Sequence, residues 1–376
     1  MQPYSLQIDF ASSEILFKDD FSPDDLKNLS PITSSILKSI LYDESEASTT
    51  ESSPVVTPVI DCPTIGKIDL ALLPEQCKTR AGSKKFQHII AKCRPEDIEK
   101  IVIVMAPHMG ALMTDVYGNY MCQSLIKSAN SSQRLMLLSS MRGHLLRISK
   151  DSQGTHSLQG LICLSSTSEE ELIYRDKFSG HIIEMAMNVN ASHVIQRLLV
   201  TLKDTSFIIR ELLGHVTELA IDKLGLCVIK KCIGNYEVYK ELLSNAHILV
   251  QDPYGNYAIQ QTLDLWGEAS HEVLANKFKG KVAQLCIQKY ASNVMEKCMH
   301  FEYLREALAA ELLNEEKMKM VLNCAYGCYV VKSAAEFGSQ KLKEGLRKIF
   351  NVVSHQLHQK KLKSRWIEIQ NALKFQ

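Results

Sequence analysis

The chain has 376 residues, 45% of them hydrophobic and 23% charged, which is ordinary for a soluble globular protein. Its net charge of +1 is unevenly divided, because residues 1–60 carry −7 and residues 61–376 carry +8. A basic body favours a polyanion as partner. No run approaches 18 consecutive apolar residues, so we expect no membrane span.

The cysteines indicate the compartment. There are 11 of them, an odd number, without a C-x-x-C pair, and several lie in apolar helical stretches. Buried thiols of this kind behave as small hydrophobic groups, so we expect a reducing environment, no disulfide framework and no metal site. The N-terminus MQPYSLQIDF lacks the basic and apolar regions of a secretory signal. We therefore expect a cytoplasmic protein with no cofactor.

Residues 1–60 have the composition of a tail. Ser, Thr, Pro and acidic residues dominate them, as in DESEASTTESSPVVTP. Such a segment buries too little apolar surface to offset the entropy of the chain, so we predict disorder here. Residues 61–376 differ in composition and are predicted to form the folded domain.

One short motif recurs through that domain, and each copy is aligned by its first residue. The spacings between copies are 36, 36, 37, 34, 30, 36 and 36 residues. Eight copies at this period predict a repeat protein. The copies are GSKKFQ at Gly82, GNYMCQ at Gly118, GTHSLQ at Gly154, ASHVIQ at Ala191, GLCVIK at Gly225, GNYAIQ at Gly255, ASNVME at Ala291 and GCYVVK at Gly327.

Each unit has the same internal order. A segment such as GHVTELAID, with apolar residues at helical spacing, precedes the motif. The motif opens a second helix, and a third amphipathic segment such as HEVLANKF follows. The sequence therefore predicts an all-α stack of three-helix repeats. Residues 61–81 and 339–376 are expected to cap its two ends.

The second helix of each unit carries three positions of interest. In the unit at Gly255, Asn256 and Gln260 are four residues apart and share a helix face, and Tyr257 lies beside them. We expect this face to be exposed and call these positions the first edge residue, the second edge residue and the plate. Amide edges around flat plates, repeated along a solenoid, suit single-stranded nucleic acid, because each base can be stacked between plates and read along its edge.

The same positions can be read in all eight units. The plates are Lys84, Tyr120, His156, His193, Cys227, Tyr257, Asn293 and Tyr329. The first edge residues are Ser83, Asn119, Thr155, Ser192, Leu226, Asn256, Ser292 and Cys328. The second edge residues are Gln87, Gln123, Gln159, Gln196, Lys230, Gln260, Glu296 and Lys332. A solvated stripe without function would vary more than this set, in which Gln occurs five times.

On these motifs, residues 61–376 resemble the Pumilio (PUF) family of sequence-specific RNA-binding proteins. YGNYAIQ and KYASNVMEKC are similar to the family's sixth and seventh repeats, and GSKKFQHII to its first. The resemblance implies a right-handed α-solenoid crescent of eight repeats, monomeric, whose concave face binds RNA antiparallel. It further implies a cytoplasmic regulator of translation or stability that binds mRNA 3′ untranslated regions, with protein co-repressors docking on the convex face or the tail.

The resemblance also implies a reading code. Asn with Gln reads uracil, Ser or Cys with Gln reads adenine, and Ser with Glu reads guanine, because a carboxylate accepts from the N1 and N2 donors of guanine. The repeats at Gly225 and Gly327 depart from the code, since Lys donates but never accepts a hydrogen bond. The implied site is 5′-(U?)-G-U-(any)-(A/U)-(A/U)-U-A.

Two other function classes stay open from the residues, and an enzyme is not expected. A nucleolar relative that binds ribosomal RNA without a code would have scrambled edge residues. A helical-repeat scaffold for proteins would have no ladder of plates. For an enzyme, the chain shows no H-x-x-x-H, G-x-S-x-G or glycine-rich phosphate loop, so no catalytic residues are expected.

Overall fold

The computed structural model describes residues 70–357 and 359–374, and every regular element in these ranges is a helix. The predicted tail and residues 61–69 of the predicted N-terminal cap lie outside the described residues. Three kinds of helix alternate along the chain, and each repeat contributes one of each. We call them the short, reading and outer helices.

The reading helices carry the plates and edge residues. They are α3 (Arg80–Ile90), α6 (Gly118–Ser128), α9 (Gly154–Cys163), α12 (Ala191–Thr201), α15 (Lys223–Cys232), α18 (Gly255–Trp266), α21 (Ala291–Cys298) and α24 (Ala325–Phe337).

The outer helices follow them in the chain. They are α4 (Pro95–Met105), α7 (Ser131–Ser140), α10 (Ser168–Phe178), α13 (Ser206–Leu212), α16 (Tyr236–Ser244), α19 (Glu268–Phe278), α22 (Glu302–Ala309) and α25 (Gln340–Ser354).

The short helices precede the reading helices. They are α2 (Leu73–Cys77), α5 (Met109–Leu112), α8 (Leu145–Lys150), α11 (Ile182–Ala186), α14 (Val216–Ala220), α17 (Ala246–Leu249), α20 (Val282–Cys286) and α23 (Glu315–Leu322). Short 3-10 turns complete several repeats: η4 (Leu70–Leu72), η5 (Ala106–His108), η6 (Arg142–His144) and η7 (Ala310–Leu313).

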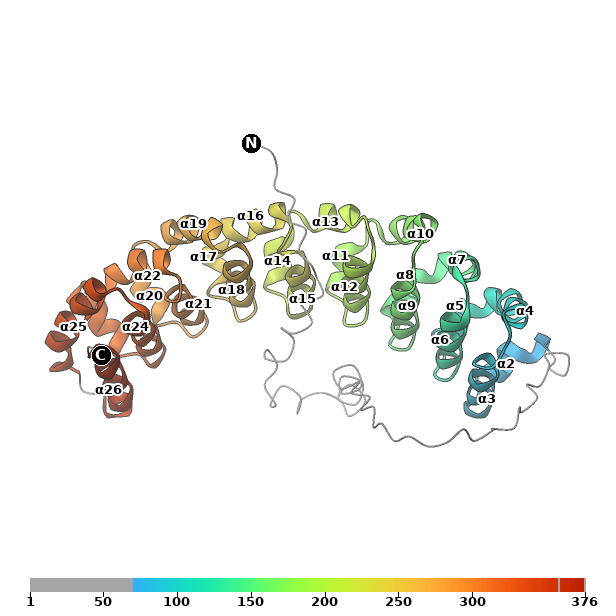
Figure 1. Cartoon of the computed structure of the whole chain (residues 1–376), viewed down its shortest axis with the longest axis horizontal. Coiled ribbons are helices and arrows are strands. Elements are labelled where there is room, and N and C mark those ends of the chain that lie inside the picture. The colour runs from blue at the N-terminus through green and yellow to red at the C-terminus, as the bar shows by residue number, and fades with distance from the viewer. Residues whose placement is uncertain (1–69, 358, 375–376) are drawn as a thin grey trace, which may run out of the picture. The chain divides into compact units, whose positions relative to one another are not determined.

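The repeats stack side by side in a curved array, with the reading helices on the concave side and the outer helices on the convex side (Figure 1). Each reading helix packs against the reading helix of the next repeat. Apolar residues of all three rows form one continuous core, in which Tyr174, Phe178 and Phe278 are among the largest fully buried side chains. In such a stack, neighbouring repeats bury apolar surface that no repeat could bury alone.

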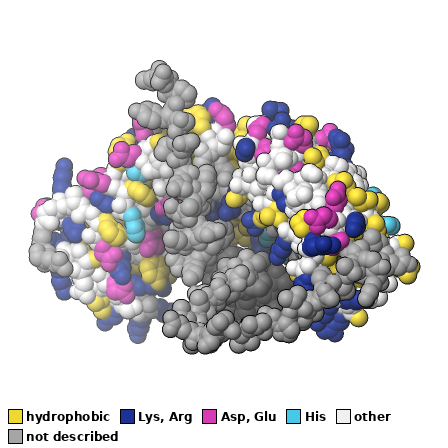
Figure 2. All heavy atoms as spheres, turned by 45° about the vertical axis from the view of Figure 1, so that its right-hand side comes forward, with side chains coloured by type: hydrophobic (Ala, Val, Ile, Leu, Met, Phe, Trp, Pro, Cys, Tyr) yellow, Lys and Arg dark blue, Asp and Glu magenta, His cyan; other side chains and the backbone are white. Residues whose placement is uncertain are grey.

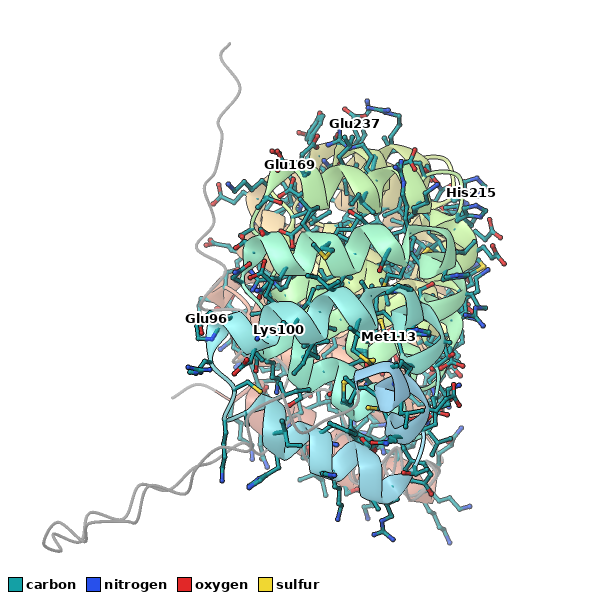
Figure 3. All side chains as sticks on the ribbon, turned by 90° about the vertical axis from the view of Figure 1, so that its right-hand side faces the viewer. Glu96, Lys100, Met113, Glu169, His215 and Glu237 are labelled. Carbon is teal, nitrogen blue, oxygen red and sulfur yellow. The ribbon has the colours of Figure 1, made fainter. Side chains whose placement is uncertain are left out.

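Seen along the stack, the rows separate clearly (Figure 3). Glu96, Glu169 and Glu237 come from three different outer helices and lie at the left edge, the upper left and the top of this view. His215, just before α14, projects from the row of short helices. On the face visible in Figure 2, basic, acidic and apolar side chains are mixed over the outer surface.

Within a repeat, a carboxylate of the outer helix caps the short helix. The Glu241 carboxylate on α16 accepts hydrogen bonds from the backbone N–H groups of Gly214 (2.8 Å) and Val216 (3.0 Å) at the start of α14. Gly214 has a φ of +87°, which favours glycine. Glu211 makes the same pair of bonds to Gly180 and Ile182 one repeat earlier. These carboxylates satisfy N–H groups that a helix start leaves unpaired.

Replacing Glu241 by Gln is expected to lower the free energy of unfolding by about 1–3 kcal/mol, because the amide turns one of its N–H groups towards a backbone N–H. Urea denaturation of the two proteins measures the difference. The control is Glu237→Gln on the same helix, whose exposed side chain pairs with Lys240 at 3.5 Å. A loss in the control as large as that in Glu241→Gln would contradict the capping role.

Candidate nucleic-acid interface

In five reading helices the start is fixed by a side chain three residues before the motif. In α18, the Asp252 carboxylate accepts hydrogen bonds from the backbone N–H groups of Tyr254 and Gly255, both at 2.8 Å. This cap sets the register of the edge residues and plate that follow. The same pair of bonds is made by Asp115, Asp151, Asn188 and Asp222. Sequence reasoning missed these residues, although the D-x-x-G pattern was visible.

The motif glycine lets the reading helix approach the short helix of its repeat. A Cβ on Gly255 would lie 2.8 Å from the carbonyl oxygen of Leu249 at the end of α17. That distance is too short for a carbon–oxygen contact without a backbone shift. Six of the eight motifs have glycine here, and the fourth and seventh have Ala191 and Ala291. Glycine therefore serves close packing and is not itself part of the reading surface.

The structure places the three positions in the same way in every repeat. All eight plates are exposed, all eight second edge residues are partly buried, and all eight first edge residues are buried. The repeats thus bring the predicted residues together as one ladder along the concave side. The plates lie on the solvent side of the reading helices, at a spacing of one repeat.

The burial of the first edge residues differs from the sequence expectation of two exposed ends. Asn256 is only 1% exposed. Its amide Nδ2 donates to the carbonyl oxygens of Asp252 (2.9 Å) and Pro253 (3.0 Å). Its Oδ1 accepts a hydrogen bond from Nε2 of Gln260 at 2.9 Å. In this structure the first edge residue therefore holds the second in place.

Three further repeats repeat this side-chain bond. Nε2 of the second edge residue donates to the first edge oxygen in the pairs Gln87–Ser83 (3.0 Å), Gln123–Asn119 (3.2 Å) and Gln159–Thr155 (3.1 Å). Orientation by a buried neighbour reduces the rotamer entropy that Gln would lose on binding a partner. Helical spacing alone does not reveal this role, because it does not show that the first edge residue is buried.

A groove of about 440 Å³ lies between the sixth and seventh repeats. Tyr257 and Gln260 line one side, and Asn293 and Glu296 line the other. The hydroxyl of Ser333 donates to Oε1 of Glu296 at 3.4 Å. Residues that sequence reasoning missed also line the groove: Asp264, Lys297, His300 and Phe301. Asp264 and Lys297 form an ion pair of 2.6 Å between the two repeats.

The histidine plates are suited to stacking as neutral rings. The helices around His156 and His193 exclude water from part of each ring, which lowers the pKa of both below the ordinary 6.5. The His156 ring lowers the pKa of His193 further, because two neighbouring imidazole rings disfavour a second positive charge. Both rings are therefore neutral at pH 7 and offer flat faces without a charge to desolvate.

The fifth repeat has a different surface. Leu226 at the first edge is buried and has no polar group to hold Lys230. Cys227 is exposed at the plate position, and desolvation of its thiol raises its pKa. The thiol is therefore protonated at neutral pH and offers a small apolar face. This repeat lacks both the flat ring and the amide pair that the second and sixth repeats present.

Within the described ranges, no group of three or more His, Cys, Asp or Glu is arranged to hold a metal ion. None of the helices described is long and apolar enough to cross a membrane.

The fold and the ladder together define an α-solenoid with one stacking and reading position per repeat. The sequence pattern of the family described as PUF, Pumilio-family RNA binding repeat, matches residues 108–141, 181–213, 215–237, 245–276 and 281–313. The chain belongs to this family of RNA-binding repeat proteins, whose members are not enzymes. The first, third and eighth repeats are not matched, yet they have the same three-helix structure.

Individual relatives support the assignment. Pumilio homolog 12 of Arabidopsis thaliana is 33% identical over 273 residues, 68% of this chain and 45% of the relative. A Pumilio domain-containing protein of Schizosaccharomyces pombe is 29% identical over 275 residues, 70% of this chain and 40% of the relative. The chain thus spans less than half the length of these relatives.

Solved structures are similar as well. The Puf4 RNA binding domain bound to the HO endonuclease RNA 3′ UTR recognition sequence has a TM-score of 0.73 and 26% identity, covering 82% of this chain and 99% of that one. The RNA-binding domain of yeast Puf5p bound to SMX2 RNA has a TM-score of 0.69 and 17% identity, covering 82% and 100%, and shows the fold alone.

Proposed function

We propose that this chain is a sequence-specific single-stranded RNA-binding protein that reads UGU-headed elements in mRNA 3′ untranslated regions, one base per repeat. The observation that carries the proposal is the ladder of exposed plates and oriented second edge residues. In four repeats a buried first edge residue holds the Gln through a hydrogen bond of 2.9–3.2 Å. A surface that bound RNA without a code would not need this orientation.

The chemistry of the edges supports the order of bases. An oriented Gln amide presents one donor and one acceptor, which match the O4 acceptor and N3 donor of uracil. The Glu296 carboxylate presents acceptors alone, which match the N1 and N2 donors of guanine. The seventh and sixth repeats would then read G and U in succession. The similar Puf4 domain is described as bound to a 3′ UTR recognition sequence, which agrees with this RNA class.

We propose further that the protein acts as a monomer in the cytoplasm and represses translation or stability of the bound mRNA. In this proposal residues 61–376 hold the RNA, and residues 1–60 or the convex outer helices recruit protein co-repressors.

Selection of RNA from a randomised pool by the full chain tests the reading. The enriched RNAs are expected to share G-U, then a tolerated base, then two A or U bases and U-A. An enriched pool without the G-U core contradicts the sequence-specific reading and favours RNA binding without a code. Failure to retain any RNA above a protein-free control favours a protein-binding scaffold.

A further inference from the structure

The last helix of the chain lies in register with the reading helices. α26 (Lys363–Ala372) follows the 3-10 turn η8 (Lys360–Leu362) and packs on α24 as α24 packs on α21. It begins 36 residues after Gly327, which itself lies 36 residues after Ala291. Trp366 anchors the helix, because its Nε1 donates to the carbonyl oxygen of Leu322 at 2.9 Å.

This register gives α26 its own set of three positions. Counting 36 residues from Cys328, Tyr329 and Lys332 gives Ser364, Arg365 and Glu368. Two of these side chains contact the eighth repeat. The guanidinium carbon of Arg365 lies 4.6 Å from the ring centroid of Tyr329, and Oε2 of Glu368 lies 2.9 Å from Nζ of Lys332. The plate and the second edge residue of the eighth repeat therefore each contact a side chain of α26.

The contact leaves no room for a base next to Tyr329 on this side. A base stacked between two plates needs a contact distance of about 3.5 Å on each of its faces. Arg365 and Tyr329 are too close to allow two such contacts. Between the sixth and seventh repeats, in contrast, the groove beside Tyr257 and Asn293 is open.

The positively charged side chain of Lys332 also has partners within the protein. Its ammonium pairs with Glu368 and also lies 3.8 Å from Glu336. The hydrogen bond from Lys332 to Glu368 is the main cause that raises the pKa of Lys332. Burial raises the pKa of the Cys328 thiol to about 11, so this first edge residue stays neutral. In the eighth repeat the second edge residue is therefore already paired within the protein, and the first is a neutral thiol.

We propose that Arg365 and Glu368 determine specificity at the 5′ end of the RNA site. These two side chains of α26 occupy the place where a base would contact the eighth repeat. The chain then reads seven bases. This inference rests on the proposed function. The first nucleotide of the implied site gains contacts only when Arg365 and Glu368 are displaced. The eighth repeat is then expected to accept any base at this position for two reasons: it lacks Gln, and α26 occupies its reading surface.

The test uses the full chain and the double variant Arg365→Ala/Glu368→Gln. The control is Glu344→Gln/Lys348→Ala on α25, which removes the same two charges from exposed positions. One measurement needs no RNA: reductive methylation of Lys332, followed over time by mass spectrometry. The other is fluorescence anisotropy with two RNAs, an octamer carrying the implied site and the heptamer without its first nucleotide.

In the unaltered chain the two RNAs are expected to bind with affinities within about 2-fold of each other, since the first base makes no stacked contact. In the double variant Lys332 is methylated faster, because its ion pair with Glu368 is gone. The octamer binds about 3- to 10-fold more tightly, because the cation–π contact and the ion pair no longer compete with its first base for Tyr329 and Lys332. The affinity for the heptamer is unchanged. The control leaves all these values unchanged.

Two results would overturn the inference. One is an unchanged rate of Lys332 methylation in the double variant. The other is weaker octamer binding in that variant with the heptamer unchanged, which would make α26 a contributor to RNA binding and not a competitor. If neither RNA binds the unaltered chain better than a scrambled octamer, the proposed function fails. The methylation rate is a separate result: if it is unchanged in the double variant, α26 does not shield Lys332.

Discussion

Replacing Tyr257 by Ala is expected to weaken RNA binding by about 5- to 150-fold, which corresponds to about 1–3 kcal/mol for the loss of one stacked base. Tyr257 is 47% exposed and lines the groove between the sixth and seventh repeats, so its ring is available to a base without rearrangement. Fluorescence anisotropy with an octamer of the implied sequence measures the change in affinity.

Two further variants show whether the ring itself is responsible. Tyr257→Phe keeps the flat face and is expected to stay within about 2-fold of the unaltered chain, because stacking needs no hydroxyl. Tyr303→Ala removes an exposed tyrosine from the outer helix α22 and should leave the affinity unchanged. A loss with Tyr257→Phe as large as that with Tyr257→Ala would contradict stacking as the source of the effect.

The sequence predicted the repeat unit well because the period and the apolar spacing are both strong signals. The motif glycines of the second, third and sixth repeats are the first residues of their helices, as expected. The fifth and eighth reading helices begin two residues earlier, at Lys223 and Ala325. In α15 the earlier start follows from Asp222, whose extended backbone and side chain form the N-cap. Aligning the repeats on the motif glycine does not show where such an N-cap starts the helix.

Contacts between helices could not be predicted for a related reason. Helical spacing shows that Asn256 and Gln260 share a face, but it does not show that Asn256 is buried. The Glu241 cap joins residues 25 and 27 positions apart in the chain through backbone groups that leave no pattern in the sequence. The register of α26 was missed because Lys363 stands where most repeats have glycine.

The double exchange Ser292→Asn with Glu296→Gln is expected to change the preferred second base from guanine to uracil. The structure indicates that the seventh repeat can accept the change. Ser292 is buried like Asn256, and its hydroxyl donates to the carbonyl oxygen of Lys289 at 3.1 Å. In the sixth repeat, Asn256 donates to the carbonyl oxygens three and four residues earlier. An amide at position 292 has the corresponding carbonyls within its own turn.

The exchange should act through the hydrogen-bonding edge and not through affinity in general. With Gln at position 296, guanine would face an amide donor with its own N1 and N2 donors, and each lost base-edge contact costs about 1–3 kcal/mol. Competition between octamers with G or U at the second position measures the preference. The single exchange Glu296→Gln is expected to abolish the guanine preference without producing the full uracil preference, because Ser292 lacks the amide oxygen that holds Gln260 in the sixth repeat. An unchanged preference for G in the double variant would contradict the assignment of Ser292 and Glu296 as readers of that base.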